Sequence, residues 1–319
     1  MKRYQEENVE IQGTYKIAGT IGIPEGKGPF PAVLLISGSG DGNRDGNFLK
    51  GKLLPNIYKG LADIISNMGF VTLRVDKRGV GESGGDLMEA GMFDLVEDIE
   101  NCVAYLAEHP KVDRIILLGH SEGCTLITAV NARRPVDGLI FISGGAESTS
   151  DALLRQRAIA KEELMNTKGL KGALLRLLRV DAKIDRQAEN LNKKIMGTNK
   201  SIIRYQFQKI NAKWFREHYE YNVFDDLEKV LCPSLAVNGD KDIQVTPEKA
   251  KDIGLYVKGP AEGVIIENMD HILKEALQPA SVLNVSKEYK ANEKKPTHPK
   301  LQEKLEEWLT KHYKTPADQ

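Results

Sequence analysis

The chain has 319 residues, a length suited to one large domain that carries an insertion. Its 45 lysine and arginine residues balance its 45 aspartate and glutamate residues, so the formal net charge is zero and no nucleic-acid or membrane partner is expected. Residues 1–10 lack the apolar core of a secretory signal, and no apolar run has the length of a membrane span. We therefore expect a cytoplasmic protein of unspecified oligomeric state.

The three cysteines, Cys102, Cys124 and Cys232, lie in apolar contexts and have no C-x-x-C spacing. This pattern argues against a disulfide framework and against a zinc site, and we expect neither a metal nor an organic cofactor. All three are expected to be small buried hydrophobes. A reactive thiol at Cys124 is the alternative, because this residue lies close in sequence to a glycine-flanked serine.

The predicted elements alternate between strands and helices along most of the chain. Residues 9–23 predict an antiparallel hairpin at a sheet edge. Residues 53–67 and 92–108 have the spacing of amphipathic helices. Short apolar runs that end in glycine or turn residues predict strands buried on both faces, at 32–36, 70–75, 114–118, 139–142, 234–237 and 264–267. The order indicates an α/β fold with a mostly parallel, doubly wound sheet and helices on both faces.

The alternation is interrupted at residues 147–231, which contain no proline and are rich in leucine, lysine, arginine, alanine and glutamate. We expect an all-helical cap or lid here, inserted into a core formed by residues 1–146 and 232–319. Its later part contains Trp214, Phe215 and Tyr219, which either wall a substrate pocket or attach the insertion to the core. His218 is a further candidate for the pocket. After the last strand, residues 275–300 predict a polar surface excursion, and 301–312 predict a final helix.

A G-x-S-x-G motif, Gly119-His120-Ser121-Glu122-Gly123, follows the predicted strand 114–118 and precedes an apolar helix. A sharp turn between strand and helix holds a serine hydroxyl clear of the backbone, at the cost of local strain. The glycines leave room where side chains would collide with the neighbouring strand and helix. The context favours Ser121 as a nucleophile, and His120, adjacent to it on a tight turn, is expected to be structural.

With this motif the chain resembles the α/β-hydrolase superfamily, specifically its serine esterases with a helical lid, and the resemblance covers most of the chain outside the insertion. It implies the chain order nucleophile, acid, histidine. Asp240 and Asp242 compete for the role of acid after the predicted strand 234–237, and the resemblance favours Asp242, with Asp240 capping the turn. It places the base at His271, in the loop after the last strand.

The glycine-rich loop after the predicted strand 32–36 begins Ser37-Gly38-Ser39-Gly40. Similar proteins donate an oxyanion N–H from this place, although many carry His-Gly where this chain has Ser37-Gly38. We expect the donors to be the backbone N–H groups of Ser39 and Glu122. The loop lacks the glycine spacing of nucleotide-binding motifs, and residues 76–83 are expected to support the site without a catalytic role.

These features predict a hydrolase that cleaves small carboxylic esters through an acyl-enzyme, with Ser121 as nucleophile, His271 as base and Asp242 as orienting acid. A thioesterase, lactonase, amidase or peptidase would use the same residues, because the pocket sets the leaving group. A binding protein on a hydrolase fold is the remaining alternative. The acyl length and the physiological substrate have no signature in the sequence.

Overall fold

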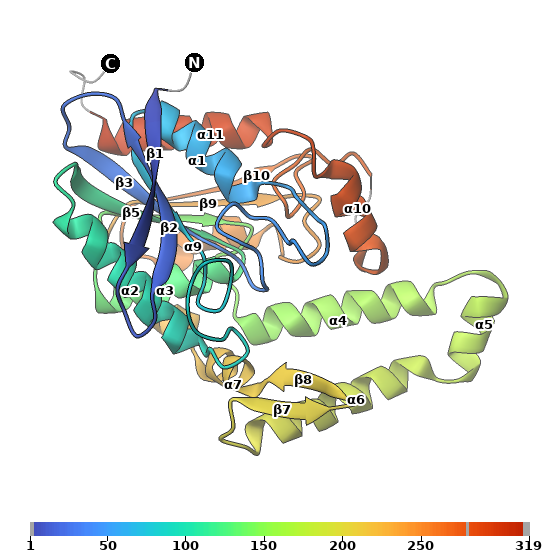
Figure 1. The fold of residues 1–319 in the computed structure, drawn as a ribbon. Coiled ribbons are helices and arrows are strands. Elements are labelled where there is room, and N and C mark those ends of the chain that lie inside the picture. The colour runs from blue at the N-terminus through green and yellow to red at the C-terminus, as the bar shows by residue number, and fades with distance from the viewer. Residues whose placement is uncertain (1–2, 279–280, 315–319) are drawn as a thin grey trace.

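The computed structural model describes residues 3–278 and 281–314, and residues 1–2, 279–280 and 315–319 of the predicted core lie outside the described part (Figure 1). Its main sheet has eight strands in the order β1-β2-β4-β3-β5-β6-β9-β10. All neighbours from β4 to β10 in this order pair in parallel, and β1–β2 and β2–β4 are antiparallel. The strands are β1 (Tyr4–Ile11), β2 (Ile17–Pro24), β3 (Phe30–Ile36), β4 (Val71–Val75), β5 (Val112–His120), β6 (Gly138–Ile142), β9 (Ser234–Gly239) and β10 (Ala261–Ile266).

Helices cover both faces of this sheet, as predicted. One face packs against α1 (Ile57–Asn67) and α11 (Pro299–Tyr313), and the other against α2 (Met92–Glu108), α3 (Glu122–Arg133), α8 (Val223–Leu227) and α9 (Lys249–Tyr256). Successive residues of one strand point to opposite faces of the sheet. Val33 packs in the cluster with α1 and α11, and Leu34 packs in the cluster with α2 and α3. Both faces of the central strands are buried, which explains their continuous apolar runs.

The first helix begins later than its periodicity predicts. Leu53 pairs with Phe48 in an isolated bridge, and α1 begins only at Ile57. Pro55 disfavours helical geometry in Leu54, and Asn56 has a left-handed backbone with φ 50°, so the helix begins only at Ile57.

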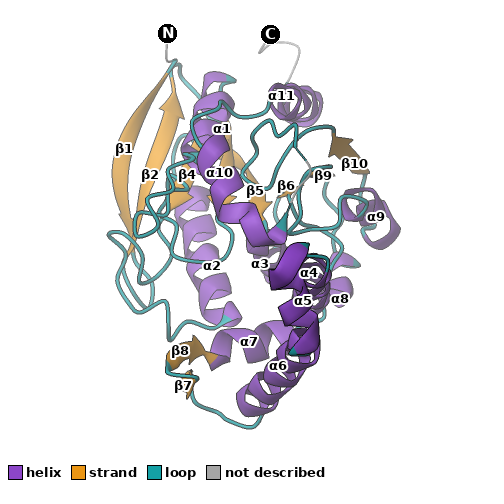
Figure 2. Cartoon of the chain, turned by 90° about the vertical axis from the view of Figure 1, so that its right-hand side faces the viewer, coloured by secondary structure: helices purple, strands orange, loops and turns teal. Residues whose placement is uncertain are grey.

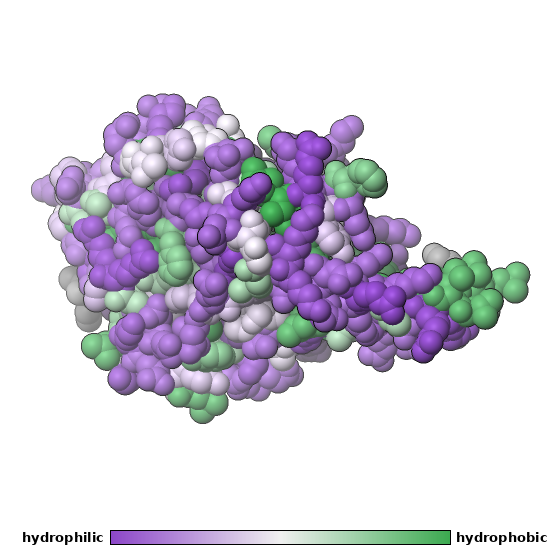
Figure 3. All heavy atoms as spheres, turned by 90° about the horizontal axis from the view of Figure 1, so that it is seen from below, coloured by the Kyte–Doolittle hydropathy of each residue, from purple (hydrophilic) through white to green (hydrophobic). Residues whose placement is uncertain are grey.

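The segment between β6 and β9 projects from the sheet as a helical excursion (Figures 1 and 2). It contains α4 (Thr149–Met165), α5 (Gly169–Leu177), α6 (Val180–Met196) and α7 (Ala212–Glu220) before α8. Its far end is apolar, because α5 exposes Leu170, Leu174 and Leu177. Figure 3 shows hydrophobic residues gathered at the projecting end of the molecule. The last part, α8, packs within the main core cluster through Val223 and Leu227.

The prediction that this insertion is entirely helical was wrong. Strands β7 (Ile202–Tyr205) and β8 (Gln208–Asn211) form an antiparallel hairpin between α6 and α7. Gln206 and Phe207 occupy its two-residue turn with φ of 46° and 66°. Two-residue hairpin turns usually contain asparagine or glycine, and this turn has neither. The only sequence signal for the hairpin was its short run of β-branched and aromatic residues.

The surface excursion after β10 also has structure of its own. It contains a short 3-10 turn (Val282–Asn284) and α10 (Val285–Asn292), and it leads into α11. Within the described residues, no helix is both long and apolar enough to cross a membrane.

Candidate active site

Ser121 occupies a strained turn between β5 and α3. Its backbone has φ 56° and ψ −120°, which is unfavourable for a residue with a side chain. The Ser121 N–H donates to the Ile142 carbonyl across 3.0 Å, and the Ser121 carbonyl accepts from the Cys124 N–H across 2.9 Å. These bonds from the neighbouring strand and the following helix hold the turn in its strained form.

The glycines that flank this turn are required by close backbone approaches. A Cβ on Gly119 would lie 2.4 Å from the Gly123 carbonyl oxygen, and a Cβ on Gly123 would lie 2.4 Å from the Ile36 carbonyl oxygen. Real Cβ atoms do not approach backbone oxygen so closely. Helix α3 can therefore start directly behind Ser121 only because both positions lack a side chain.

Asp242 and His271 lie next to each other, although 28 residues separate them in the chain. His271 Nδ1 and Asp242 Oδ2 are 2.8 Å apart, and Asp242 Oδ1 accepts from the Gln244 N–H across 2.8 Å. Both side chains are buried. Burial alone would raise the pKa of Asp242, but His271 and the Gln244 N–H lower it overall. A carboxylate in this position fixes the imidazole with Nε2 free for a partner.

Within the described residues, Asp240, the competing aspartate, forms no hydrogen bond or ion pair with His271. Its carboxylate accepts from the Asn268 N–H across 2.6 Å and pairs with Lys241 across 2.9 Å. These contacts tie the loop after β9 to the loop that carries His271.

The side chain of His120 contacts the loop that carries His271. Its Nε2 lies 2.9 Å from the His271 carbonyl oxygen, and its Nδ1 lies 3.1 Å from the Tyr58 hydroxyl. Burial, reinforced by the nearby His271, lowers the pKa of His120 to about 3, so the ring is neutral. A neutral ring meets both contacts if Nε2–H donates to the carbonyl and Nδ1 accepts the tyrosine proton. Tyr58 in turn accepts from the Gly38 N–H across 2.8 Å, which links the base loop to the glycine-rich loop.

The two predicted oxyanion donors face the same space as the serine. Ser39 and Glu122 line a cavity together with Ser121, and neither of their backbone N–H groups donates to an acceptor within the described chain. Gly38 is not available for this role, because its N–H bonds to Tyr58 and its carbonyl accepts from Lys77 Nζ across 2.5 Å. Lys77 thus holds the glycine-rich loop in place.

The side chain of Glu122 links the serine turn to the insertion. Its carboxylate accepts from the Trp214 indole N–H across 2.5 Å, lies 3.2 Å from His218 Nε2 and lies 3.7 Å from Lys77 Nζ. Burial raises the pKa of Glu122, but the charge of Lys77 and the contacts with His218 and Trp214 lower it to about 2. An ionised carboxylate is therefore held directly behind the candidate nucleophile.

Two cavities meet at Ser121. One, of about 220 Å³, is lined by Ser121, His271 and apolar side chains that include Phe48, Ile272 and Tyr289. The other, of about 120 Å³, is lined by Ser39, Ser121, Glu122 and more polar neighbours. Within the described residues the Ser121 hydroxyl has no hydrogen-bond partner. The hydrogen bond between a nucleophile and its base is often long or poorly aligned until substrate binds.

The four predicted pocket residues have different positions. Trp214 lines the 120 Å³ cavity, whereas Phe215 and Tyr219 line a separate cavity of about 480 Å³ inside the insertion. The expectation that His218 lines a pocket was wrong, because its side chain is fully buried, with Nδ1 2.9 Å from the Trp214 carbonyl oxygen and Nε2 3.2 Å from a Glu122 carboxylate oxygen. The aromatic cluster thus both walls cavities and attaches the insertion to the core.

The cysteines differ from expectation at one position. Cys102 and Cys124 are buried, but Cys232 is only half-buried. The Cys124 thiol lies behind the serine turn, 3.2 Å from the Gly119 carbonyl oxygen, and burial raises its pKa to about 12. A thiol in this environment is not a ready nucleophile.

The model of the serine aminopeptidase family S33, a group of hydrolases, matches residues 55–271, a range that includes Ser121, Asp242 and His271. The chain belongs to this family. Among curated proteins, this S33 chain is 26% identical over 273 residues to Esterase EstD of Thermotoga maritima, and the match covers 85% of the chain. The same match covers 60% of the length of the Thermotoga protein, so the chain spans less than two thirds of that relative.

Solved structures share the fold of this chain. A structure of Est1E from Butyrivibrio proteoclasticus with bound ferulic acid superposes with a TM-score of 0.59 at 19% identity, covering 89% of this chain and 96% of that one. The α/β hydrolase GrgF from a Penicillium species gives 0.59 at 16% identity, covering 97% and 99%. The predicted α/β-hydrolase fold is confirmed.

Sequence reasoning missed several residues that shape this S33 site. Tyr58 lies on α1, far from any motif, and Gln244 lines both cavities at Ser121 without a recognisable pattern. Lys77 was expected only as a support, and its contact with Glu122 had no sequence signal. Its position two residues after the buried strand β4 is the one clue, because a charge next to the core must find a partner.

Proposed function

We propose that the protein is a serine hydrolase that cleaves carboxylic esters through an acyl-enzyme intermediate. Ser121 attacks the ester carbonyl as His271 takes its proton, and His271 then returns the proton to the departing alcohol. Water, deprotonated by the same imidazole, releases the acid. Asp242 stabilises the imidazolium formed in each half of the reaction.

The observation that carries this proposal is the 2.8 Å contact between His271 Nδ1 and Asp242 Oδ2 beside a cavity that Ser121 also lines. It orients the remaining imidazole nitrogen for a proton transfer. The unpartnered N–H groups of Ser39 and Glu122 at the same serine suit the oxygen that becomes negative during attack. Each such donor typically contributes about 2.7 to 4 kcal/mol to transition-state stabilisation.

An aminopeptidase is the second candidate, because the family takes its name from that activity. Such an enzyme needs an acidic group to bind the free amino terminus of its substrate. Two carboxylates line the 120 Å³ cavity, but Glu147 pairs with Arg155 at 3.2 Å and Glu122 is bonded to Trp214. Because both carboxylates already have partners, neither is free to bind an amino terminus, and this favours an ester substrate over a peptide. The name of the Thermotoga relative, an esterase, agrees.

The proposal is tested by stopped-flow hydrolysis of p-nitrophenyl acetate, with aminoacyl p-nitroanilides as the peptide-like comparison. We expect a burst of p-nitrophenol equal to the enzyme concentration, followed by slower turnover, and no comparable cleavage of the anilides. Ser121→Ala should abolish the burst. Turnover that persists in Ser121→Ala, or preference for the anilides, would contradict the proposal.

A further inference from the structure

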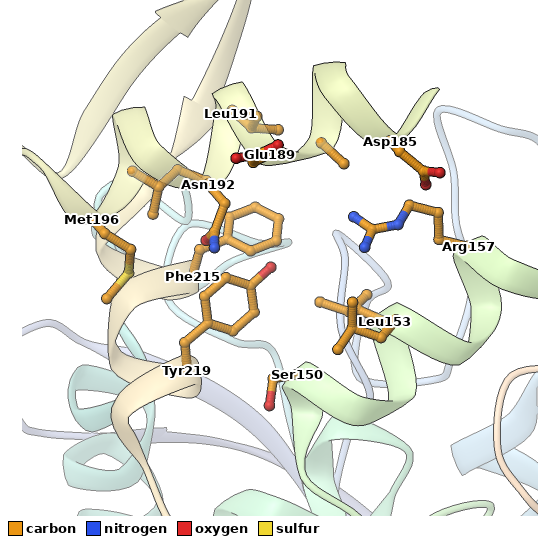
Figure 4. A pocket seen from close by; sticks show the side chains of 13 residues that line it. Ser150, Leu153, Arg157, Asp185, Glu189, Leu191, Asn192, Met196, Phe215 and Tyr219 are labelled. Carbon is orange, nitrogen blue, oxygen red and sulfur yellow. The ribbon is translucent and has the colours of Figure 1, made fainter. Parts of the chain in front are cut away.

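A third cavity lies inside the insertion, away from the serine turn. It occupies about 480 Å³ between α4, α6 and α7 (Figure 4). Its walls are largely apolar and include Leu153, Leu191, Ile195 and Phe215. The volume is within the range of sites that bind small molecules.

Leu153 connects this cavity to the candidate active site. The same side chain also lines the 120 Å³ cavity that contains Ser121, Ser39 and Glu122. Among the residues that the structure describes, Leu153 on α4 is the one that lines both cavities. The cavity at Ser121 and the cavity of the insertion are therefore adjacent at Leu153.

The insertion cavity also has a polar side. Arg157 and Tyr219 both point into it from facing helices, α4 and α7 (Figure 4). Burial raises the pKa of Tyr219, and the positive charge of Arg157 acts in the opposite direction. The guanidinium of Arg157 is therefore close enough to the Tyr219 phenol to interact with it electrostatically. A guanidinium and a phenol together offer donors that match a carboxylate.

The acidic residues that line the cavity form ion pairs with lysines and not with Arg157. Asp185 lines the cavity but pairs with Lys161 at 2.5 Å, and Glu189 pairs with Lys193 at 2.7 Å. Arg157 forms no ion pair with any residue in the described ranges 3–278 and 281–314. Its charge remains available to a ligand.

We propose that the insertion cavity binds the far end of an apolar acyl group that carries a terminal carboxylate, with Arg157 as its ion-pair partner and Tyr219 as a hydrogen-bond donor. The preferred substrates are then half-esters of linear dicarboxylic acids: the ester carbonyl lies at Ser121, the chain passes Leu153, and the free carboxylate reaches Arg157. This inference rests on the proposed esterase function and adds the substrate class.

The test compares p-nitrophenyl octanoate with the mono-p-nitrophenyl ester of octanedioic acid. The wild-type protein should prefer the half-ester, and Arg157→Gln should lower kcat/KM for the half-ester about tenfold while changing the neutral ester little. Arg157→Lys should restore part of the preference, because it restores the charge without the planar fork. Arg186→Gln is the matched control, since Arg186 lies exposed on α6 and does not line the cavity.

Equal losses on both esters in Arg157→Gln, or no loss on either, would overturn the inference. A direct measurement separates it from the proposed function: calorimetric titration with octanoate, which needs no turnover. Binding to the wild type and about tenfold weaker binding to Arg157→Gln would support the cavity even if no ester were hydrolysed. Equal binding to both proteins would overturn it, even if the wild type were an active esterase.

Discussion

The indole N–H of Trp214 and the carboxylate of Glu122 form a 2.5 Å hydrogen bond between the insertion and the serine turn. Glu122 directly follows Ser121, so this bond joins α7 to the residue whose N–H faces the candidate oxyanion position. Trp214→Phe keeps the apolar ring and removes the donor. We expect it to lower the free energy of unfolding by about 1.5 to 3 kcal/mol, as measured by urea denaturation, because the lost bond is to a charged group.

A double-mutant cycle with Glu122→Gln controls that prediction. Removing the carboxylate charge leaves Lys77 buried without its ion-pair partner, so the single change should be destabilising by about 3 kcal/mol or more. Glu122→Gln removes the charge that strengthens this bond and Trp214→Phe removes its donor, so the two effects should not add. Additive losses would show that the contact between Trp214 and Glu122 contributes nothing of its own.

The glycines around Ser121 predict a large and local effect on stability. Gly123→Ala places a methyl group against the Ile36 carbonyl oxygen, and we expect a loss of about 3 kcal/mol in unfolding free energy or failure to fold. Gly254→Ala is the control: it lies within α9, its nearest contact would be 3.7 Å away, and it should be neutral or stabilising by up to about 1 kcal/mol. Similar stability of both variants would contradict the packing described for the turn.

His120 predicts a specific loss of stability on acidification. Its pKa is near 3 in the folded protein and 6.5 in a free side chain, so folding favours the neutral ring. The stabilisation is complete above about pH 6.5 and is lost as the pH falls from there toward 3, at up to about 1.4 kcal/mol per pH unit. The measurement is urea denaturation of wild type and His120→Gln between pH 7 and pH 5.

The His120→Gln protein should be less stable at neutral pH but should lose less stability between these pH values, because it lacks the titrating ring. The window avoids Glu122, whose lowered pKa removes stability only below its ordinary value near 4.5. Parallel curves for the two proteins would mean that His120 is not held neutral.

The two aspartates after β9 provide a matched pair for catalysis. Asp242→Asn should lower kcat by about 10⁴-fold, because the asparagine no longer fixes the tautomer of His271. Asp240→Asn should cost much less, since its carboxylate bonds to the Asn268 N–H and to Lys241. Steady-state hydrolysis of p-nitrophenyl acetate measures both. Equal, mild losses would show that neither residue is the acid.

The sequence predicted the elements that follow from local pattern. The buried strands read as apolar runs because both faces of the sheet are covered, and α2 was predicted to the residue, Met92 to Glu108, from its periodicity. The environment of Ser121 was also predictable, because a strand, a glycine-bounded turn and a helix are adjacent in the chain.

Features that depend on distant contacts had no such signal. The β7–β8 hairpin has a turn without glycine or asparagine, and the start of α1 was decided by Pro55 and Asn56 rather than by the apolar spacing. His218 was expected to line the pocket because it belongs to the insertion, yet its side chain is fully buried, 3.2 Å from a carboxylate oxygen of Glu122. The position of Tyr58 was also not predictable, because its hydroxyl contacts Gly38 and His120, which are distant in the chain.

The central claim, that Ser121 is the nucleophile, is tested most directly by locating the residue that a fluorophosphonate modifies. Peptide mass spectrometry after labelling should find one adduct, on the peptide that contains Ser121, and heat-denatured protein should carry none. The label should form far more slowly in a His271→Ala variant, because the imidazole takes the proton of the attacking hydroxyl. An adduct on a different residue, or an unlabelled protein that still hydrolyses esters, would contradict the assignment.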